Sequence, residues 1–225
     1  MAMFIIPPMR MDIDERLLTL TQWLSPAYPL GAFAYSQGVE SAVASGWVTD
    51  AESLVAWLRD ALTDGTGRTD AIWLRLAHAA PDAAALARLD AEARAFAATR
   101  ERLREAERQG TAFAATTRAV WGIDLPDLLL PLAVGRAARL VGLDIEAVVP
   151  LYLHGIASNL ATASMRLLPV GQVAAQRIVA DLTPLCLDIA RTTRDAEPED
   201  IHANTFLADI ASMRHETLEP RLFQS

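Results

Sequence analysis

The feature that most constrains the fold is a long stretch without any formal charge, from Ala147 to Met165. Apolar residues at helical spacing run through it and predict one helix from Ile145 to Arg166: Ile145, Val148, Val149, Tyr152, Leu153, Ile156, Leu160 and Ala163. Pro150 must either kink this helix or mark its first turn. A helix with so little polar surface belongs in the middle of a bundle. Its opposite side carries small residues that would let another helix or a second subunit approach closely: Gly155, Ser158, Asn159 and Thr162.

Helix signals recur along the rest of the chain, whereas the alternating β-branched runs typical of strands are missing. A first helix is expected to begin at Asp14 and to stop at Ser25-Pro26. Thr49 with Glu52 reads as a capping box for a second helix, with Gly65 as its C-terminal cap. A further helix is predicted over residues 69–80. These signals together predict an all-α fold.

The middle of the chain is an Ala-rich helical segment that opens at Pro81-Asp82 and runs towards Gly122. Between Arg100 and Arg108 it carries charges of both signs at helical spacing. Such a run is typical of a solvated face with exposed ion pairs. We therefore expect no function from it.

The last third divides into a helix and a tail. A helix is predicted from Gly171 to Thr193, with a kink at Pro184. Residues 195–200 then form an acidic break, and the remaining residues show no sustained period. We expect a single domain over residues 1–225, a bundle of about ten helices, with a helical core at about 14–194. The C-terminal stretch 195–225 is expected to be a partly flexible tail outside the core.

Composition excludes several classes of function. The net charge of −8 and the pI near 5.0 oppose a general nucleic-acid binder. All 20 basic residues are arginine, so a phosphate-loop lysine, a Schiff-base lysine and a Ser-Lys dyad are all impossible. Cys186 is the only cysteine, which excludes an intrachain disulfide and indicates a buried thiol. The start, MAMFIIPPMR, lacks the apolar core of a signal peptide, and no run approaches the ~20 apolar residues of a membrane-spanning helix. The expected location is cytoplasmic, without membrane or nucleic-acid partners.

Patterns of catalysis and metal binding are equally scarce. The histidines His78, His154, His202 and His215 form no HxxxH or HExxH pair. Ser36 lies in AYSQGVE rather than in a nucleophile elbow, and it reads first as a helix N-cap. No GxGxxG follows a predicted strand. We expect no catalytic residue, no resident metal and no cofactor.

Three sequence segments are richer in specific residues than a plain helical core requires. They read SPAYPLGAFAYSQGVE at 25–40, SMRLLPVGQ at 164–172, and IASMRHET at 210–217 followed by RLFQS at 221–225. They resemble the urease accessory protein family UreF, whose usual forms are close to SPxxPxGxFxYSxGLE, SAxxRLxPLGQ, IASMRHE and RLFxS. The resemblance spans the chain from about Leu17 to Ser225. Departures from it are Ala32, Val39, Val170 and Gln224, the last at a position that is often basic.

The resemblance implies a function carried by protein contacts. It implies an all-α homodimer that binds the accessory protein UreD (also called UreH) and recruits the GTPase UreG. The assembly would engage apo-urease (UreABC) and deliver nickel as UreG hydrolyses GTP. Nickel would then be cargo, GTP would bind UreG, and this chain would be no enzyme.

The same resemblance implies a set of partner-binding residues in the three segments: Tyr35, Ser36, Gln37, Glu40, Arg166, Gln172, Arg214, His215, Glu216, Arg221, Leu222 and Phe223. Each has a plainer reading. The first four can simply cap and start a helix, Gln172 can be a first-turn polar residue, and the C-terminal six can belong to a disordered tail. Arg166 closes a charge-free helix, so a specific carboxylate or carbonyl partner is expected for it. In the tail, Leu222 and Phe223 would anchor a partner and Arg214 and Arg221 would make directional contacts.

Two other function classes stay open from the residues alone. One is an enzyme with a pocket inside the helical bundle, and the other is a helical regulator that binds a ligand. A DNA-binding regulator would need a basic recognition helix, which the net charge of −8 opposes. Co-purification of UreD and UreG would decide among these readings.

Overall fold

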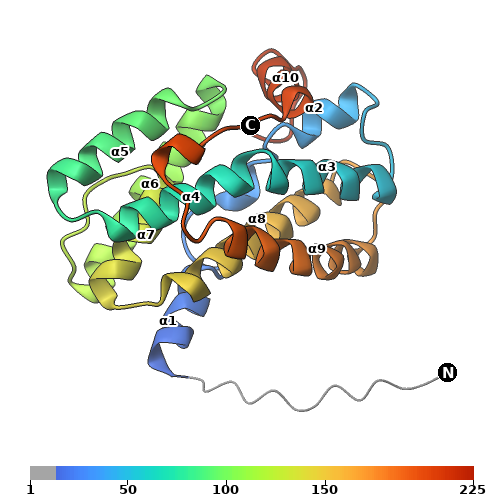
Figure 1. Ribbon diagram of the computed structural model, residues 1–225. Helices are drawn as coiled ribbons and strands as arrows, with labels where there is room; N and C mark the ends of the chain where they lie inside the picture. The colour runs from blue at the N-terminus through green and yellow to red at the C-terminus, as the bar shows by residue number, and fades with distance from the viewer. Residues whose placement is uncertain (1–13) are drawn as a thin grey trace.

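The computed structural model describes residues 14–225, and the described part is all-α, as predicted (Figure 1). The reading of the N-terminal stretch 1–13 as no signal peptide lies outside the described residues. The helices are α1 (Glu15–Trp23), η1 (Ala32–Ala34), α2 (Val39–Ala44), α3 (Ala51–Thr63), α4 (Thr66–Ala79), α5 (Ala83–Ala95), α6 (Arg100–Trp121), α7 (Leu130–Val141), α8 (Ile145–Ser164), α9 (Gln172–Thr192), η2 (Pro198–Asp200) and α10 (Phe206–His215). None of the helices in 14–225 combines the length and the apolar surface needed to cross a membrane.

The charge-free helix lies inside the bundle, as the sequence indicates. α8 begins at Ile145 and packs against α9, with α3 and α4 also in contact. Pro150 sits inside α8 in its second turn, and the helix ends at Ser164, two residues before Arg166. The side with small residues meets η1, where the Asn159 amide donates to the Ala32 carbonyl at 3.1 Å. The predicted helix is therefore confirmed except for its last two residues.

α4 and α7 pack closely against each other in the bundle core. A Cβ atom added at Gly135 would lie 2.2 Å from the carbonyl oxygen of Leu74, so the two backbones touch at this glycine. From the same helix α4, Arg75 reaches across the core. It pairs with Glu146 of α8 at 2.5 Å and donates to the Ala190 carbonyl of α9 at 2.7 Å. This buried arginine therefore joins three helices.

Several predicted helix ends are wrong by a few residues. The capping box before α3 is made by Asp50 and Ser53, because these side chains face each other's backbone N–H, whereas Thr49 lies one residue too early. Gly65 precedes α4 instead of capping α3, whose C-cap is Asp64. The Ala-rich segment splits into α5 and α6 because Thr99 caps a new helix by accepting from the Arg102 N–H.

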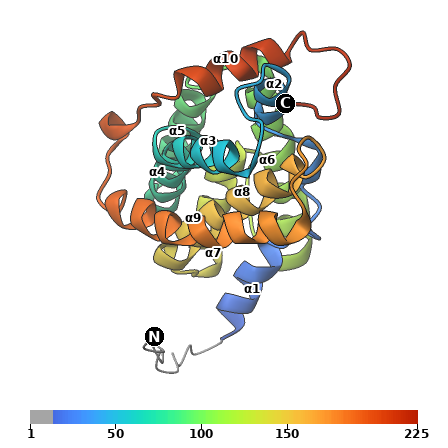
Figure 2. The same cartoon turned by 90° about the vertical axis from the view of Figure 1, so that its right-hand side faces the viewer.

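The C-terminal stretch is the main departure from the sequence prediction. Figure 2 shows α10 on the side of the bundle away from α7 and α9, where it packs against α2. His215 is 0% exposed and Phe223 is 3% exposed. The expectation that residues 195–225 form a tail outside the core is therefore wrong for these residues. Helical periodicity could not reveal this burial, because the covering residues come from α2 and α6, more than a hundred residues away.

Candidate functional site

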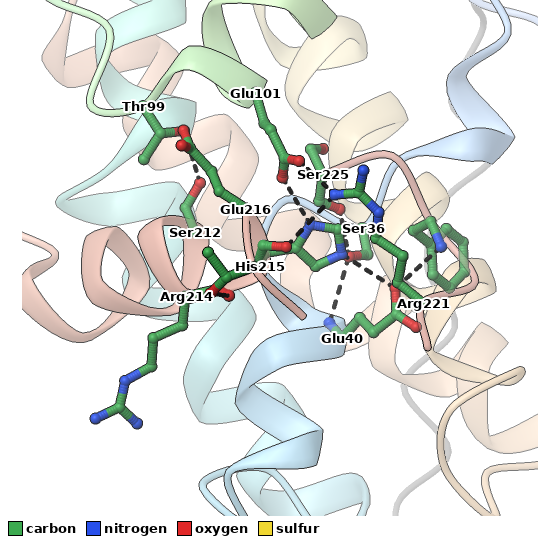
Figure 3. Close-up of polar contacts among 12 residues, drawn as sticks. Ser36, Glu40, Thr99, Glu101, Ser212, Arg214, His215, Glu216, Arg221 and Ser225 are labelled. Carbon is green, nitrogen blue, oxygen red and sulfur yellow. Dashed lines mark hydrogen bonds and ion pairs between the residues drawn. The ribbon is translucent and has the colours of Figure 1, made fainter. Parts of the chain in front are cut away.

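The first and last family-like segments meet on the N-terminal half of α6 (Figure 3). We call this meeting point the C-terminal junction. Its members come from the loop before α2, from α2, α6 and α10, and from the last five residues: Ser36, Glu40, Glu101, Glu105, His215, Arg221 and Ser225. Of the twelve predicted site residues, all but Gln172 belong to this junction or lie near it.

His215 occupies the centre of the C-terminal junction, between two carboxylates. Its Nδ1 lies 2.7 Å from Glu101 Oε2, and its Nε2 lies 3.1 Å from Glu40 Oε2. Each ring nitrogen therefore has a carboxylate oxygen within hydrogen-bonding distance. The ring thereby ties α10 to α2 on one side and to α6 on the other.

Glu40 also holds the final residues of the chain. Its Oε1 accepts from the Leu222 N–H at 2.6 Å, and its Oε2 accepts from the Phe223 N–H at 2.9 Å. Glu101 receives Arg221 at 2.5 Å. A buried carboxylate is costly unless cations and N–H groups satisfy its oxygens, and both glutamates meet that condition.

The last two residues pair with the loop before α2. The Ser36 N–H and hydroxyl both donate to the Ser225 carbonyl, at 2.9 and 2.6 Å. The Gln224 N–H donates to the Ala34 carbonyl at 2.8 Å. Ser36 was expected to cap a helix. Its hydroxyl does accept from the Glu40 N–H, at 3.3 Å, but the N-cap of α2 is Gly38.

Glu105 lies beneath Ser225 and is 2% exposed. It accepts from the Ser225 hydroxyl at 2.6 Å and from the Gln37 amide at 3.0 Å, and it pairs with Arg102. The reading of residues 100–108 as a wholly solvated face is therefore wrong for Glu101 and Glu105. These two glutamates, Gln109, Phe113 and Thr117 recur every four residues along α6, and all five are buried. That continuous stripe was the sequence signal that could have revealed them.

The turn that delivers Glu40 has two successive residues in the left-handed region. Gln37 has a φ of 54° and Gly38 a φ of 85°. The glycine also lets α10 approach, since a Cβ there would lie 3.2 Å from the Ser212 nitrogen. A non-glycine residue at positive φ costs on the order of 1 kcal/mol, and here the bond from Gln37 to Glu105 holds it in place.

Two arginines of the predicted set find aromatic partners. The Arg166 guanidinium lies 4.6 Å from the centroid of the Phe223 ring, and that of Arg214 lies 5.1 Å from the Trp47 ring. For Arg166 the expected carboxylate or carbonyl partner is therefore replaced by a cation–π contact. The sequence could not show this because Arg166 and Phe223 are far apart along the chain.

The remaining predicted site residues differ in burial and in their contacts. Tyr35 is buried beside the C-terminal junction, and Glu216 pairs with Arg100 at 2.9 Å, a contact that holds the Glu216 pKa below its ordinary value. Leu222 is 58% exposed beside buried Phe223. Gln172 is the exposed first residue of α9 and makes no side-chain hydrogen bond to the described residues, which fits its plainer reading.

A cavity of about 670 Å³ opens inside the bundle next to the C-terminal junction, with mostly apolar walls and with Glu105 in its lining. In its wall the Tyr152 hydroxyl donates to Asp70 at 2.8 Å. Burial, helped by the nearby charge of Glu105, raises the pKa of Asp70 to about 7, against the opposing pull of that hydrogen bond and of Arg102. The sequence leaves open an enzyme with a pocket inside the bundle, but it identifies neither Asp70 nor the walls of this cavity, because the walls come from segments scattered over the chain.

The geometry of the C-terminal junction does not suit a metal ion. The two nitrogens of His215 face opposite ways, so Glu40 and Glu101 cannot converge with the ring on one ion. Across residues 14–225, no group of three or more His, Cys, Asp or Glu side chains could hold a metal. What the junction offers instead is a fixed surface built from two distant segments.

Comparison with known proteins identifies the family. Residues 48–183 match the family model for UreF. The chain is 49% identical over 213 residues to the urease accessory protein UreF of Cereibacter sphaeroides, covering 95% of this chain and all of the relative. It is 45% identical over 212 residues to that of Ruegeria pomeroyi, covering 94% of this chain and 98% of the relative. The chain belongs to the UreF family of urease accessory proteins. Two of the three segments that resemble UreF, at residues 25–40 and 210–225, build the C-terminal junction.

Proposed function

We propose that this UreF-family chain is a scaffold of urease maturation that binds UreD and recruits and modulates the GTPase UreG. In this role it engages apo-urease as part of that assembly and serves nickel insertion without being an enzyme. Nickel is cargo and GTP belongs to UreG, so the chain has no cofactor of its own. A homodimer is part of the proposal, and light scattering of the purified protein tests it.

The observation that carries the proposal is that the RLFQS segment has both buried side chains, which fix it to the bundle, and an exposed apolar side chain. Phe223 and Ser225 are buried and hold the segment on α2 and α6, while Leu222, directly before Phe223, stays 58% exposed. Fixing a segment in advance reduces the conformational entropy lost when a partner binds. An exposed leucine on a fixed backbone is a suitable anchor for a partner.

Deleting residues 210–225 would be a poor test, because the deletion removes buried His215 and Phe223 as well as the exposed surface. A single exposed side chain is a sharper probe. Leu222→Asp should abolish co-purification of UreD and leave the circular dichroism spectrum unchanged. Leu187→Asp is the matched control, since Leu187 of α9 is 57% exposed. Equal capture of UreD by both variants would contradict the proposed site.

The cavity favours a second candidate function, the binding of a small ligand inside the bundle. Its volume of about 670 Å³ lies within the range of ordinary ligand sites. Our proposal instead requires that the purified chain alone neither hydrolyses GTP nor binds nickel tightly. Turnover of GTP by the clean protein, or stoichiometric sub-micromolar nickel binding in calorimetry, would contradict this requirement.

A further inference from the structure

A small pocket with an unusual charge opens beside the C-terminal junction. It has a volume of about 230 Å³ and is lined by six residues: Tyr35, Glu101, Arg104, Arg108, Arg221 and Gln224. We call it the arginine pocket. Three guanidinium groups face one carboxylate there, although the whole chain carries a net charge of −8. A locally positive pocket on an acidic protein favours an anionic ligand.

Two of these arginines lack an anionic partner within residues 14–225. Arg104 makes no hydrogen bond or ion pair there, and Arg108 donates only to the neutral Gln224 side chain, at 2.7 Å. Glu101 cannot neutralise them, because it already receives His215 and Arg221. Like charges four residues apart on a helix repel each other. An anion between Arg104 and Arg108 would remove that repulsion.

The geometry points to a carboxylate side chain of a protein partner, and we propose that the arginine pocket receives one. Guanidinium groups bind carboxylates through paired N–H donors. The pocket wall continues into the RLFQS segment, where Leu222 is exposed, and arginine next to apolar anchors is typical of protein interfaces. A free phosphate fits less well. Phosphate sites commonly use a helix N-terminus, whereas Arg104 and Arg108 lie in the second and third turns of α6.

The inference rests on the proposed function, because it assumes that the chain binds UreD and UreG. The test uses the full chain with purified UreD and UreG. In Arg104→Glu/Arg108→Glu both arginines are reversed in charge. The matched control is Arg59→Glu/Arg88→Glu, which makes the same change at exposed positions of α3 and α5 that have no side-chain partner in the described part. Circular dichroism checks that both variants fold.

We expect wild type and control to bind UreD and UreG with the same affinity. The Arg104→Glu/Arg108→Glu variant should bind them at least about tenfold more weakly. Raising the salt concentration should weaken wild-type binding more than that of the neutral variant Arg104→Gln/Arg108→Gln. Equal affinity of the charge-reversed variant and its control would overturn the inference. So would calorimetric binding of inorganic phosphate that the neutral variant loses, since the pocket would then serve a free anion. If wild type itself binds neither UreD nor UreG, the proposed function fails instead.

Discussion

The buried glutamates of the C-terminal junction and the half-buried Asp70 of the cavity wall have opposite surroundings. At the C-terminal junction, Glu40 and Glu101 accept from backbone N–H groups, an imidazole and a guanidinium. In the cavity wall, Asp70 has one hydrogen-bonding partner among residues 14–225, the Tyr152 hydroxyl. Satisfied carboxylates can hold distant segments together as charged groups, whereas an isolated one is driven towards its neutral form. Removing a carboxylate should therefore destabilise the first region and stabilise the second.

The largest effect is expected at Glu40. Glu40→Leu leaves His215 and the N–H groups of Leu222 and Phe223 without their acceptor, and breaking such a buried cluster costs about 3 to 5 kcal/mol. The loss should appear in urea unfolding and as faster hydrogen exchange at the two amides. Glu40→Gln keeps one acceptor oxygen and should therefore lose less stability than Glu40→Leu. Unchanged exchange in Glu40→Leu would mean that Glu40 does not hold the segment.

The carboxyl group of Asp70 should destabilise the protein, and the size of this effect on the free energy of unfolding should depend on pH. Its pKa is raised from 3.8 to about 7 in the folded protein, so the fold keeps a proton that the unfolded chain releases near pH 4. The free energy of unfolding should therefore fall as pH rises from about 4 to 7, by at most roughly 4 kcal/mol, and stay level above that.

Asp70→Asn should abolish the fall in stability between pH 4 and 7. The variant should be more stable than wild type at pH 8, with little difference at pH 4. Thermal unfolding of both proteins across the pH range measures the difference in stability. Tyr152→Phe is the companion variant, because it keeps the ring and removes the hydroxyl that stabilises the charged form. A decline that persists unchanged in Asp70→Asn would place its origin at another group.

A smaller effect is expected from Arg166, which touches the C-terminal junction from outside through Phe223. Arg166→Ala removes a cation–π contact of about 0.5 to 2 kcal/mol, so the fold should persist with a modestly lower Tm. We expect co-purification of UreG to decrease, because the Phe223 side chain would be less firmly held. A large drop in Tm with UreG captured normally by the folded fraction would make Arg166 purely structural.

The smallest effect is expected at Arg100. It pairs with Glu216, but its side chain is 78% exposed, and exposed ion pairs contribute little. Arg100→Ala should leave urea unfolding within experimental error of wild type. A clear destabilisation would show that α10 depends on this pair more than on the buried contacts of His215.

The sequence predicts some parts of the molecule better than others for physical reasons. α8 was predictable because its own residues carry both the helical spacing and the absence of charge. α7 was not singled out, although it packs closely on α4 through Gly135. The motif residues Glu40 and His215 were recognised, but their contact was not, since only the folded chain brings α2, α6 and α10 together. Glu101 and Glu105 were misread because charge pattern alone cannot tell a satisfied buried carboxylate from a solvated one.

The bond between Ser36 and Ser225 spans 189 residues, which has a consequence for the order of events during synthesis. At roughly 5 to 20 residues per second, Ser225 is added about 10 to 40 s after Ser36. Until then Glu40 lacks its histidine and its two amides, although the helices between can already pack locally. A nascent chain that has not yet reached Ser225 therefore cannot form the C-terminal junction, however well its earlier helices have packed.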